Sequence, residues 1–442
     1  MRALPGVSVL IAGAGLAGLT AARELSKKGA TVTVIDARSR VGGRVLTLRE
    51  GFRHRQHAEA GADLIDGDQK EIRTLVSQLG LKLTEILPGG FTLLKDVGGR
   101  RVRGTEGWLD LERRLRPEIR AFCLGERRWD GAVAQTIGRQ SVADWLNRVK
   151  APRTVRAMAS ALRGFFLADP EDLSLLALVE QLAEDGPPGR GTMYRVVGGN
   201  DRIAAALARP LGERLRLGTV LRAVVQSAGG VRATVQTAAG NDQIEADYLI
   251  CAMPASTVRD VTFDPPLPAP QHEANRSLKY GHCTKTALQF DRAVWRKRGK
   301  PRAFGTNLSI GAVWDGNEEQ HGTAGILTSM AGGRASVDTK AMLASSGPRR
   351  LVEQMDFLEL KGASLVAWDS VSWEDDPWAR GGYAYYDPSF NPAVREWLAR
   401  PFRRVFFAGE HTSLEGQGYM NGAVESGLRA AEEISSTREL GN

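Results

Sequence analysis

The chain has 442 residues, 42% of them hydrophobic and 25% charged, a composition typical of a globular protein with room for two or three domains. It contains no stretch of roughly 18 uninterrupted apolar residues, so we expect no membrane anchor, and its apolar start lacks the cleavage boundary of a signal peptide. The net charge of +8 comes from basic residues spread along the chain, without a basic arm, and predicts no nucleic-acid partner. Three cysteines without short spacing (Cys123, Cys251 and Cys283) indicate neither a disulfide framework nor a metal site, and they fit a reducing, cytoplasmic setting.

The first 36 residues carry the clearest pattern: a strand, a glycine-rich turn, a helix and a second strand. Residues 7–12 are apolar and β-branched, as expected of a short buried strand. Of the glycines that follow, Gly13 permits a tight turn, Gly15 lets the backbone approach a pyrophosphate, and Gly18 lets helix and strand pack closely. Asp36 ends the second strand, where its carboxylate can accept hydrogen bonds from ribose hydroxyls. Together with the free N–H groups at the start of the helix, this pattern predicts dinucleotide binding.

The next segments, up to residue 182, predict shorter elements. Small residues around Gly61 suit a backbone that lies against a flat ring, although a simple turn fits the local sequence as well. Apolar periodicity predicts a helix over 70–80, strands pair within 91–102, and Ser141 caps a helix over 141–148. The apolar stretches 164–167 and 173–182 are typical of core packing, with the lining of a pocket as the alternative.

The second half of the chain is expected to contribute further elements to the first domain. A helix is predicted over 203–208, and we expect the strands 215–226, 231–236 and 246–253 to join the parallel sheet of the first domain. A second excursion, 280–391, carries several aromatic residues. A last strand, 404–410, reaches a glycine, and residues 418–427 open a terminal helix. Two interleaved domains result, each built from separated segments.

In this order the motifs resemble those of the flavin-containing monoamine oxidase family, within the FAD-dependent amine oxidase superfamily. The resemblance spans nearly the whole chain. It is carried by GAGLAGLTAARELSKKGATVTVIDARSRVGGR, YRVVGGNDRIAAALA, DYLICAMPASTVRDVTFDPPLP, KYGHCTKTALQFDRAVW, WEDDPWARGGY and FFAGEHTSLEGQGYMNGAVESGLRAA. It implies an α/β fold in which a Rossmann-type FAD-binding domain (1–85, 195–280 and 392–442) is interleaved with an α+β substrate-binding domain (86–194 and 281–391).

The resemblance also implies which residues contact the cofactor. Glu410 would hold the ribityl chain, and the helix that begins near Gly418 would point its positive end toward the pyrimidine edge of the flavin. The full set of implied FAD contacts is Gly13, Gly15, Leu16, Ala17, Asp36, Arg38, Arg44, Gly61, Ala62, Val220, Trp373, Gly409, Glu410, Gly418, Tyr419, Met420 and Ala423.

Catalytic and substrate-pocket residues follow from the same resemblance. Lys285 matches the family lysine that reaches flavin N5 through a water, and because it lies on an apolar strand it needs a partner. Tyr419 matches one of two tyrosines that form an amine-binding cage in front of the flavin. The residues expected to line the substrate pocket are Phe166, Tyr194, Tyr383, Ala384 and Tyr385.

Two departures from the family pattern bear on cofactor and substrate. Tyr383 follows the paired glycines where members with covalent flavin have a cysteine, so we expect FAD to be bound non-covalently. The first cage tyrosine aligns with Ala384, so the cage is half open or is completed by Tyr383 or Tyr385.

These residues predict an FAD-dependent oxidase that converts an amine to its imine while O2 is reduced to H2O2. An L-amino acid oxidase, which needs a cation for the substrate carboxylate, and a polyamine oxidase, for which Glu180, Glu184 and Asp185 are candidate acidic residues, are the alternatives on the same scaffold. A membrane-bound desaturase and a non-catalytic, flavin-bearing interaction module are more distant ones. The expected partners are a small-molecule amine and O2, and a homodimer is possible.

Overall fold

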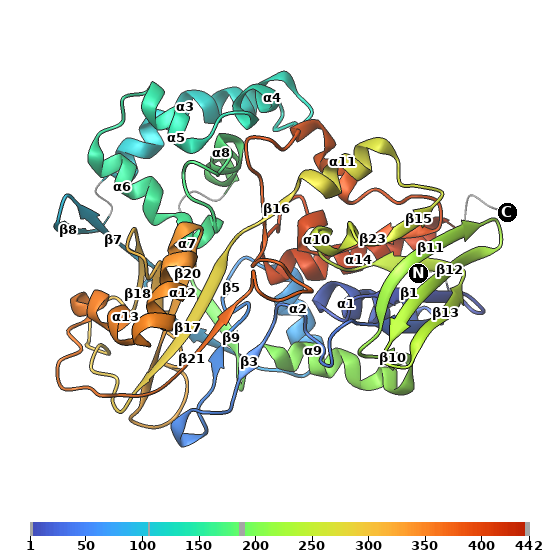
Figure 1. Ribbon diagram of the computed structural model, residues 1–442, viewed down its shortest axis with the longest axis horizontal. Coiled ribbons are helices and arrows are strands. Elements are labelled where there is room, and N and C mark those ends of the chain that lie inside the picture. The colour runs from blue at the N-terminus through green and yellow to red at the C-terminus, as the bar shows by residue number, and fades with distance from the viewer. Residues whose placement is uncertain (1–2, 105–106, 185–190, 438–442) are drawn as a thin grey trace.

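The structure, a computed structural model, describes residues 3–104, 107–184 and 191–437. Figure 1 shows two parts side by side: one holds both ends of the chain, and the other combines a large sheet with a group of helices. The chain passes between these parts several times, so each is assembled from separated segments. The interleaved mixed α/β architecture expected from the sequence is confirmed.

A parallel sheet forms the centre of the first part. Its strand order is β10-β2-β1-β14-β23, and every neighbouring pair is parallel. Strands β14 and β23 are buried at every position, as expected of parallel strands covered on both faces. The bounds are β1 Ser8–Ala12, β2 Thr31–Ile35, β10 Leu215–Arg216, β14 Tyr248–Cys251 and β23 Val405–Phe407.

Helices cover one face of this sheet, where Val9 and Ile11 pack into a common core with them. Helices α1 and α14 approach closely at a glycine, because a Cβ on Gly427 would lie 2.4 Å from the carbonyl oxygen of Ala17. The N-termini of both helices therefore lie near the same end of the sheet (Figure 1). The covering helices are α1 Leu16–Lys27, α2 Lys70–Gln78, α9 Asp201–Ala208 and α14 Met420–Thr437.

A second sheet covers the opposite face, with Leu10 and Ala12 in the shared core. Its order is β13-β12-β11-β15, and its bounds are β11 Val220–Ser227, β12 Gly230–Thr237, β13 Gly240–Ala246 and β15 Thr262–Asp264. The expectation that the runs 215–226 and 231–236 join the parallel sheet is therefore wrong, apart from the two residues of β10. Exposed residues recur along β11 and β12, as in antiparallel strands with one face in water, whereas the parallel strands β14 and β23 are buried at every position.

The second part is built on a seven-stranded mixed sheet of order β21-β17-β20-β19-β18-β7-β8. Strand β17 lies between β20 and β21 and is buried at all its positions. The bounds are β7 Thr92–Val97, β8 Arg100–Arg103, β17 Cys283–Phe290, β18 Ala303–Thr306, β19 Ala312–Asp315, β20 Gly325–Gly332 and β21 Leu365–Ser372.

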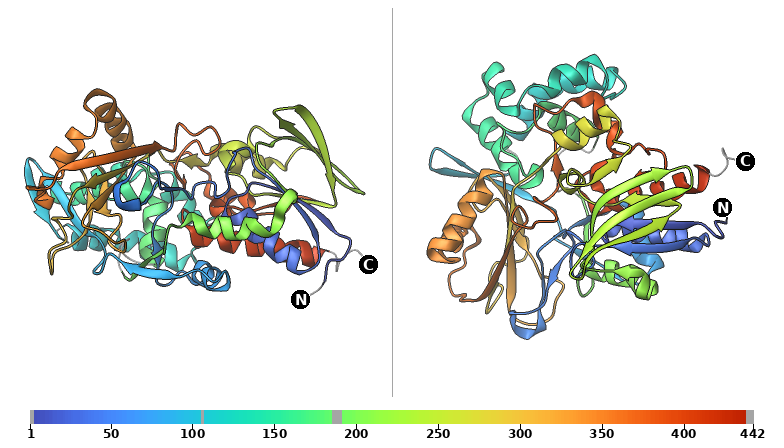
Figure 2. Two further views of the ribbon diagram at one scale, coloured as in Figure 1. Left: turned by 90° about the horizontal axis from the view of Figure 1, so that it is seen from below. Right: turned by 45° about the vertical axis from the view of Figure 1, so that its right-hand side comes forward.

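A helical cluster sits beside this sheet, above it in Figure 1 and in both views of Figure 2 recognisable by its teal colour. Helix α5 begins with the predicted capping box, in which Ser141 and Asp144 bond to each other's backbone N–H. The cluster comprises α3 Trp108–Leu124, α4 Ala132–Gly138, α5 Val142–Arg148, α6 Arg153–Ala161, α7 Arg163–Phe166 and α8 Leu175–Glu184.

Short elements connect the two parts. Strand β9 pairs with β5 and β6, and β16 pairs with β22. The strands are β3 Thr47–Leu48, β4 Ala58–Glu59, β5 Ile65–Asp66, β6 Leu83–Ile86, β9 Met193–Val196, β16 Lys279–Tyr280 and β22 Ala384–Tyr385. The remaining helices are α10 Ala255–Val258 and α11 Ala269–Ser277, together with α12 Arg334–Ser346 and α13 Arg349–Gln354, which follow β20 and pack against the seven-stranded sheet of the second part (Figure 1). Turns of 3-10 helix lie at Arg53–Arg55, Arg209–Arg214, Asp356–Leu358, Pro392–Leu398 and Glu410–Thr412. Within the described ranges, no helix combines the length and the apolar character needed to cross a bilayer.

Candidate active site

A single cavity runs from the glycine-rich turn after β1 to the aromatic residues of the second part. Seventeen residues were expected from the sequence to contact a cofactor, and all of them line it: Gly13, Gly15, Leu16, Ala17, Asp36, Arg38, Arg44, Gly61, Ala62, Val220, Trp373, Gly409, Glu410, Gly418, Tyr419, Met420 and Ala423. Segments that are far apart in sequence therefore meet around one space.

The three glycines of the N-terminal turn each have the geometry that a dinucleotide site requires. Gly13 has a φ of +119°, and a Cβ there would lie 2.5 Å from the carbonyl oxygen of Ala252. A Cβ on Gly18 would lie 2.0 Å from the carbonyl oxygen of Gly13, so this glycine allows helix and strand to touch. A Cβ on Gly15 would meet nothing within 4 Å, because that residue faces the open cavity. The turn thus leaves room for a pyrophosphate at the start of α1.

Asp36 lies at the end of β2 and lines the cavity. Its carboxylate accepts the backbone N–H of Ala14 at 2.7 Å and that of Arg38 at 2.8 Å. Burial raises the pKa of Asp36 despite these two bonds. The Arg38 side chain turns away to pair with Asp376 at 2.6 Å, which ties the cofactor end to the second part of the molecule.

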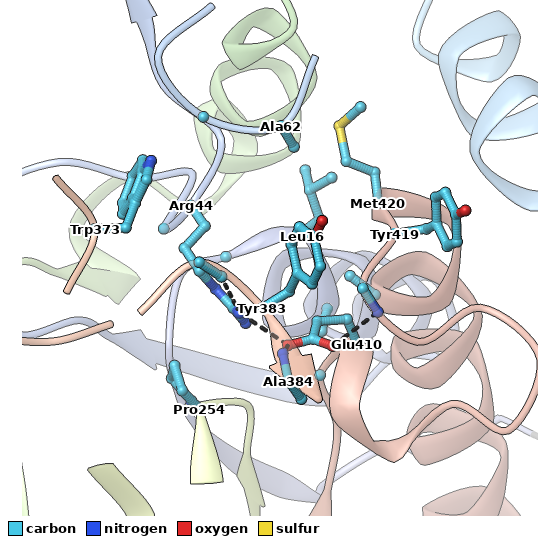
Figure 3. A pocket seen from close by; sticks show the side chains of 18 of the residues that line it. Leu16, Arg44, Ala62, Pro254, Trp373, Tyr383, Ala384, Glu410, Tyr419 and Met420 are labelled. Atoms are coloured by element: carbon cyan, nitrogen blue, oxygen red, sulfur yellow. Dashed lines mark hydrogen bonds and ion pairs between the residues drawn. The ribbon is translucent and has the colours of Figure 1, made fainter. Parts of the chain in front are cut away.

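Glu410 anchors the centre of the cavity. It accepts Nη1 of Arg44 at 2.8 Å and the backbone N–H of Gly418 at 2.9 Å, the latter just before α14 begins (Figure 3). Burial alone would raise the pKa of Glu410, but the neighbouring Arg44 holds it below its usual range, so the carboxylate stays charged. The neighbouring His411 is buried, which lowers its pKa to about 4 and leaves the ring neutral.

The segment around Gly61 forms another wall. A Cβ on Gly61 would lie 2.0 Å from the carbonyl oxygen of Arg44, so the chain can only pass there without a side chain. The indole N–H of Trp373 donates to the carbonyl oxygen of Ala60 at 2.8 Å and holds that ring against the same segment. These contacts leave the backbone of Gly61 and Ala62 facing the cavity.

Lys285 reaches this segment from β17. Its Nζ donates to the carbonyl oxygen of Gly61 at 2.8 Å and to Asp63 Oδ2 at 3.2 Å, and the side chain is 3% exposed. The partner that a buried lysine requires is therefore Asp63. Lys285 also lines the cavity, together with the cofactor-binding segments and the aromatic residues.

At the aromatic end, Phe166, Tyr383, Ala384 and Tyr385 line the cavity, as does Tyr419. The Tyr383 hydroxyl donates to the carbonyl oxygen of Phe165 at 2.6 Å, and its ring packs against Gly418. Figure 3 shows Tyr383 between Trp373 and Tyr419, so its ring, rather than the methyl group of Ala384, faces this space.

Tyr194, which was expected to line the substrate pocket, does not line the cavity. It lies on β9, where its ring packs under the guanidinium of Arg73 at 5.0 Å. Successive residues of a strand point to opposite sides, so it is the next residue, Arg195, that turns toward the site.

The sequence reasoning missed the residues behind Lys285. Asp63 accepts the Nε–H of Arg195 at 2.7 Å and the indole N–H of Trp314 at 2.9 Å, and all three side chains are buried. A signal was present, because Asp63 and Arg195 are charged residues inside largely apolar runs. Of the three acidic candidates, Glu180 of α8 lines the cavity, whereas Asp185 and the side chain of Glu184 lie outside the described part of the chain.

A Rossmann-type sheet, a glycine turn shaped for a pyrophosphate and a buried lysine beside an aromatic end define a flavin-dependent oxidoreductase. The model of the flavin-containing amine oxidoreductase family matches residues 16–435, and this chain belongs to that family. It is an FAD-dependent enzyme that oxidises amines.

Individual proteins of known sequence or structure are similar to this chain along nearly its whole length. A putative flavin-containing monoamine oxidase, AofH of Mycobacterium tuberculosis, is 28% identical over 97% of both chains. The fold is shared with a cyclohexylamine oxidase from Brevibacterium oxydans, with a TM-score of 0.85 and 24% identity over 98% of this chain and 100% of that one. A putrescine oxidase solved with putrescine gives a TM-score of 0.82 and 25% identity over 97% and 99% of the two chains.

Proposed function

We propose that the protein oxidises an amine that carries no carboxylate, and that O2 takes up the electrons to give H2O2. When bound, non-covalently, FAD supplies the redox chemistry at the carbon beside the nitrogen. The chain's residues then have two tasks: they hold the cofactor along the glycine turn, Asp36 and Glu410, and they shape a dry space for the amine between Lys285 and the tyrosines.

The pairing of the cations around the cavity carries this proposal. Among the described residues that line it, four cations are bonded to carboxylates: Arg38 to Asp376, Arg44 to Glu410, Lys285 to Asp63 and Arg395 to Glu180. The fifth, Arg222, bonds to Gln236 and lies on β11 beside Val220, at the cofactor end. Of these five only Arg222 lacks a carboxylate partner, and because it lies at the cofactor end, no described cation at the aromatic end is left to receive a substrate carboxylate, which an L-amino acid oxidase requires.

Arg395 shows how complete this pairing is. Its Nη1 donates to Glu180 at 2.5 Å, its Nη2 to the carbonyl oxygen of Leu414 at 2.8 Å, and its Nε to the Tyr386 hydroxyl at 3.1 Å. The guanidinium also stacks on the Trp129 ring at 4.0 Å. A substrate carboxylate would have to displace these partners, so Arg395 favours amines over amino acids.

A polyamine is the second candidate substrate, and Glu180 favours it. One carboxylate oxygen of Glu180 is bound to Arg395 and to the indole N–H of Trp129, while the other accepts no hydrogen bond among the described residues. Glu415 lines the same region. These acidic groups offer a place for a second ammonium.

Peroxide release from a panel of simple amines, diamines and L-amino acids distinguishes these substrates. We expect turnover of monoamines, with rates that rise from pH 6 toward pH 9, because an alkylamine has a pKa of about 10 and only its neutral form has the lone pair that assists oxidation. Diamines outperforming monoamines of equal length, with that advantage lost in Glu180→Gln, would support the polyamine alternative. Turnover of amino acids alone would contradict the proposal.

We also propose that the protein works in the cytoplasm without a membrane anchor, as a homodimer. The three cysteines are free thiols, and two of them, Cys251 and Cys283, are buried. Light scattering on the purified protein measures its assembly, and fractionation of its host cells measures its location.

A further inference from the structure

A buried charge cluster stands behind Lys285. On β17, Lys285 lies between Met330 of β20 and Val371 of β21, which bring no charge to it. Its counter-ion comes from elsewhere in the fold: Asp63, 3.2 Å away, in the segment that follows Gly61. The Trp314 ring, 4.9 Å from Nζ, closes another side. The ammonium is thus held by one carboxylate, one carbonyl and one aromatic ring.

Asp63 is in turn fixed by two donors. Arg195 of β9 donates its Nε–H to Oδ1, and Trp314 of β19 donates its indole N–H to Oδ2. Burial alone would raise the pKa of Asp63, but Arg195 and Lys285 hold it below its usual range. The carboxylate therefore stays charged, and it cannot rotate away from Lys285 without losing both bonds.

The remaining titratable groups near the cluster leave its charges balanced. Arg195 also binds Glu319 at 2.7 Å. Burial and the charge of Asp63 raise the pKa of Glu59 to about 8, so Glu59 is mostly neutral at pH 7. Burial raises the pKa of Cys283, which precedes Lys285 on the same face of β17, to about 12. Two cations and two carboxylates remain, and of these four Lys285 and Asp63 line the cavity.

We propose that Asp63 is a positioning residue for Lys285, and that Arg195 and Trp314 hold Asp63 in place so that the amino group of Lys285 stays beside this carboxylate and points into the cavity. This inference rests on the proposed function, in which electrons leave the amine inside that space. A positive charge that is already oriented would stabilise the negative charge that bound FAD gains as it accepts those electrons, without the cost of reorganisation. Arginine cannot give up its proton, so if Asp63 were lost, Lys285 would be the cation that does.

The test compares Asp63→Asn with Asp315→Asn in the FAD-loaded enzyme. Asp315 is an equally buried carboxylate with the same kinds of partners, Trp295 and Arg296, but it does not line the cavity. In Asp63→Asn we expect the visible absorption of the bound flavin to show a titration step between pH 6 and 10 that the wild type and Asp315→Asn lack. We expect the double variant Asp63→Asn/Lys285→Met to lose that step, which separates it from any titration of Glu59.

Turnover gives the second readout. In Asp63→Asn we expect kcat at pH 7 to fall roughly ten- to a hundredfold, the range seen when a partner that orients a metal ligand is removed, with less than about a twofold change in KM. If Asp63→Asn does not fold, Asp63→Glu serves instead, with the same changes at smaller size. An unchanged spectrum and an unchanged kcat, or a step that persists in the double variant, would overturn the inference. The spectral step needs no substrate, so it stands even if the protein turns over none of the amines offered.

Discussion

Two buried clusters, one around Asp63 and one around Asp315, have nearly the same hydrogen-bond partners but different positions. They meet at neighbouring residues of β19, Trp314 and Asp315. Asp63 accepts Trp314 Nε1 and Arg195 Nε, at 2.9 and 2.7 Å, and Asp315 accepts Trp295 Nε1 and Arg296 Nε, at 3.0 and 2.6 Å. Trp314 and Asp315 are adjacent on β19, so they point to opposite faces of the sheet.

What differs is what each cluster touches. The Asp315 cluster is closed by Asn317, whose side chain accepts from Arg296 at 2.7 Å. The Asp63 cluster instead ends in Lys285 at the cavity, and Nη2 of Arg195 has no partner among the described residues. Ion-pair networks with a purely structural role share this chemistry, so a buried ion pair is by itself weak evidence for function. The two clusters are therefore distinguished by their position relative to the cavity rather than by the chemistry of the ion pair.

The largest expected difference between the clusters is in stability. Asp63→Asn leaves a fully buried guanidinium without its main partner, so we expect a loss of about 3–5 kcal/mol in the free energy of unfolding. Asp315→Asn leaves Arg296, whose side chain is partly exposed, so we expect about 1–3 kcal/mol. Urea unfolding of both variants measures these losses, and equal losses would contradict the difference in burial.

Next in size is the effect of the lysine that distinguishes the clusters. We expect Lys285→Met to lower kcat about a hundredfold, because an oriented charge at the reacting space is removed while Asp63 keeps its bonds to Arg195 and Trp314. Lys279→Met, an exposed lysine on β16 that does not line the cavity, is the control and should change kcat less than about twofold. Steady-state peroxide assays measure both, and parity between the two variants would refute a role for Lys285.

A smaller effect concerns pH. Glu59, which receives N–H of Asn200 and the hydroxyl of Thr47, has a pKa raised from 4.5 to about 8 by burial and by Asp63. The folded protein therefore binds a proton that the unfolded chain has released, and this contribution to stability declines as the pH rises from about 4.5 to 8. The slope is at most about 1.4 kcal/mol per pH unit.

We expect Glu59→Gln to remove this decline. Its stability relative to the wild type should be greater at pH 8 than at pH 5, as measured by urea unfolding at both values. Contributions from other titrating groups cancel in the difference between the two proteins. A relative stability that does not change between the two pH values would show that Glu59 is already ionised at pH 5 in the folded state.

The smallest expected effect is at Tyr194, the neighbour of Arg195 on the other side of β9. Tyr194→Phe keeps the ring that packs under Arg73, so we expect kcat/KM for any accepted amine to change less than about twofold. A changed preference among amines in the peroxide assay would place Tyr194 in the substrate pocket after all.

The sequence predicted best where the physics is local. The turn at Gly13, Gly15 and Gly18 follows from steric needs within one strand–turn–helix unit, and the capping box at Ser141 involves a side chain and backbone three residues apart. The ion cluster could not be predicted in this way, because Asp63 and Arg195 are separated by 132 residues and meet only through the pairing of β9.

Two other predictions, on the sheet that β11 and β12 join and on the position of Tyr194, were wrong because they depend on residues that are distant in the sequence. The runs that became β11 and β12 were expected in the parallel sheet, but they pair antiparallel with each other and with β13, and one face of the sheet they form packs on the parallel sheet. On β9, the family resemblance implied a pocket position for Tyr194, whereas the face that each residue presents is decided by the register of the strand.

Because Trp314 and Asp315 point to opposite faces of the sheet, β19 must pair with its neighbours in a single register. Its neighbours β18 and β20 fix which residue of the pair looks inward. A slip of a single residue would carry Asp315 to the amine side and withdraw the indole that steadies Asp63. The placement of charge beside the cavity therefore depends on the register of β19. Substitutions far from the cofactor site that loosen this sheet would abolish activity before they unfold the protein.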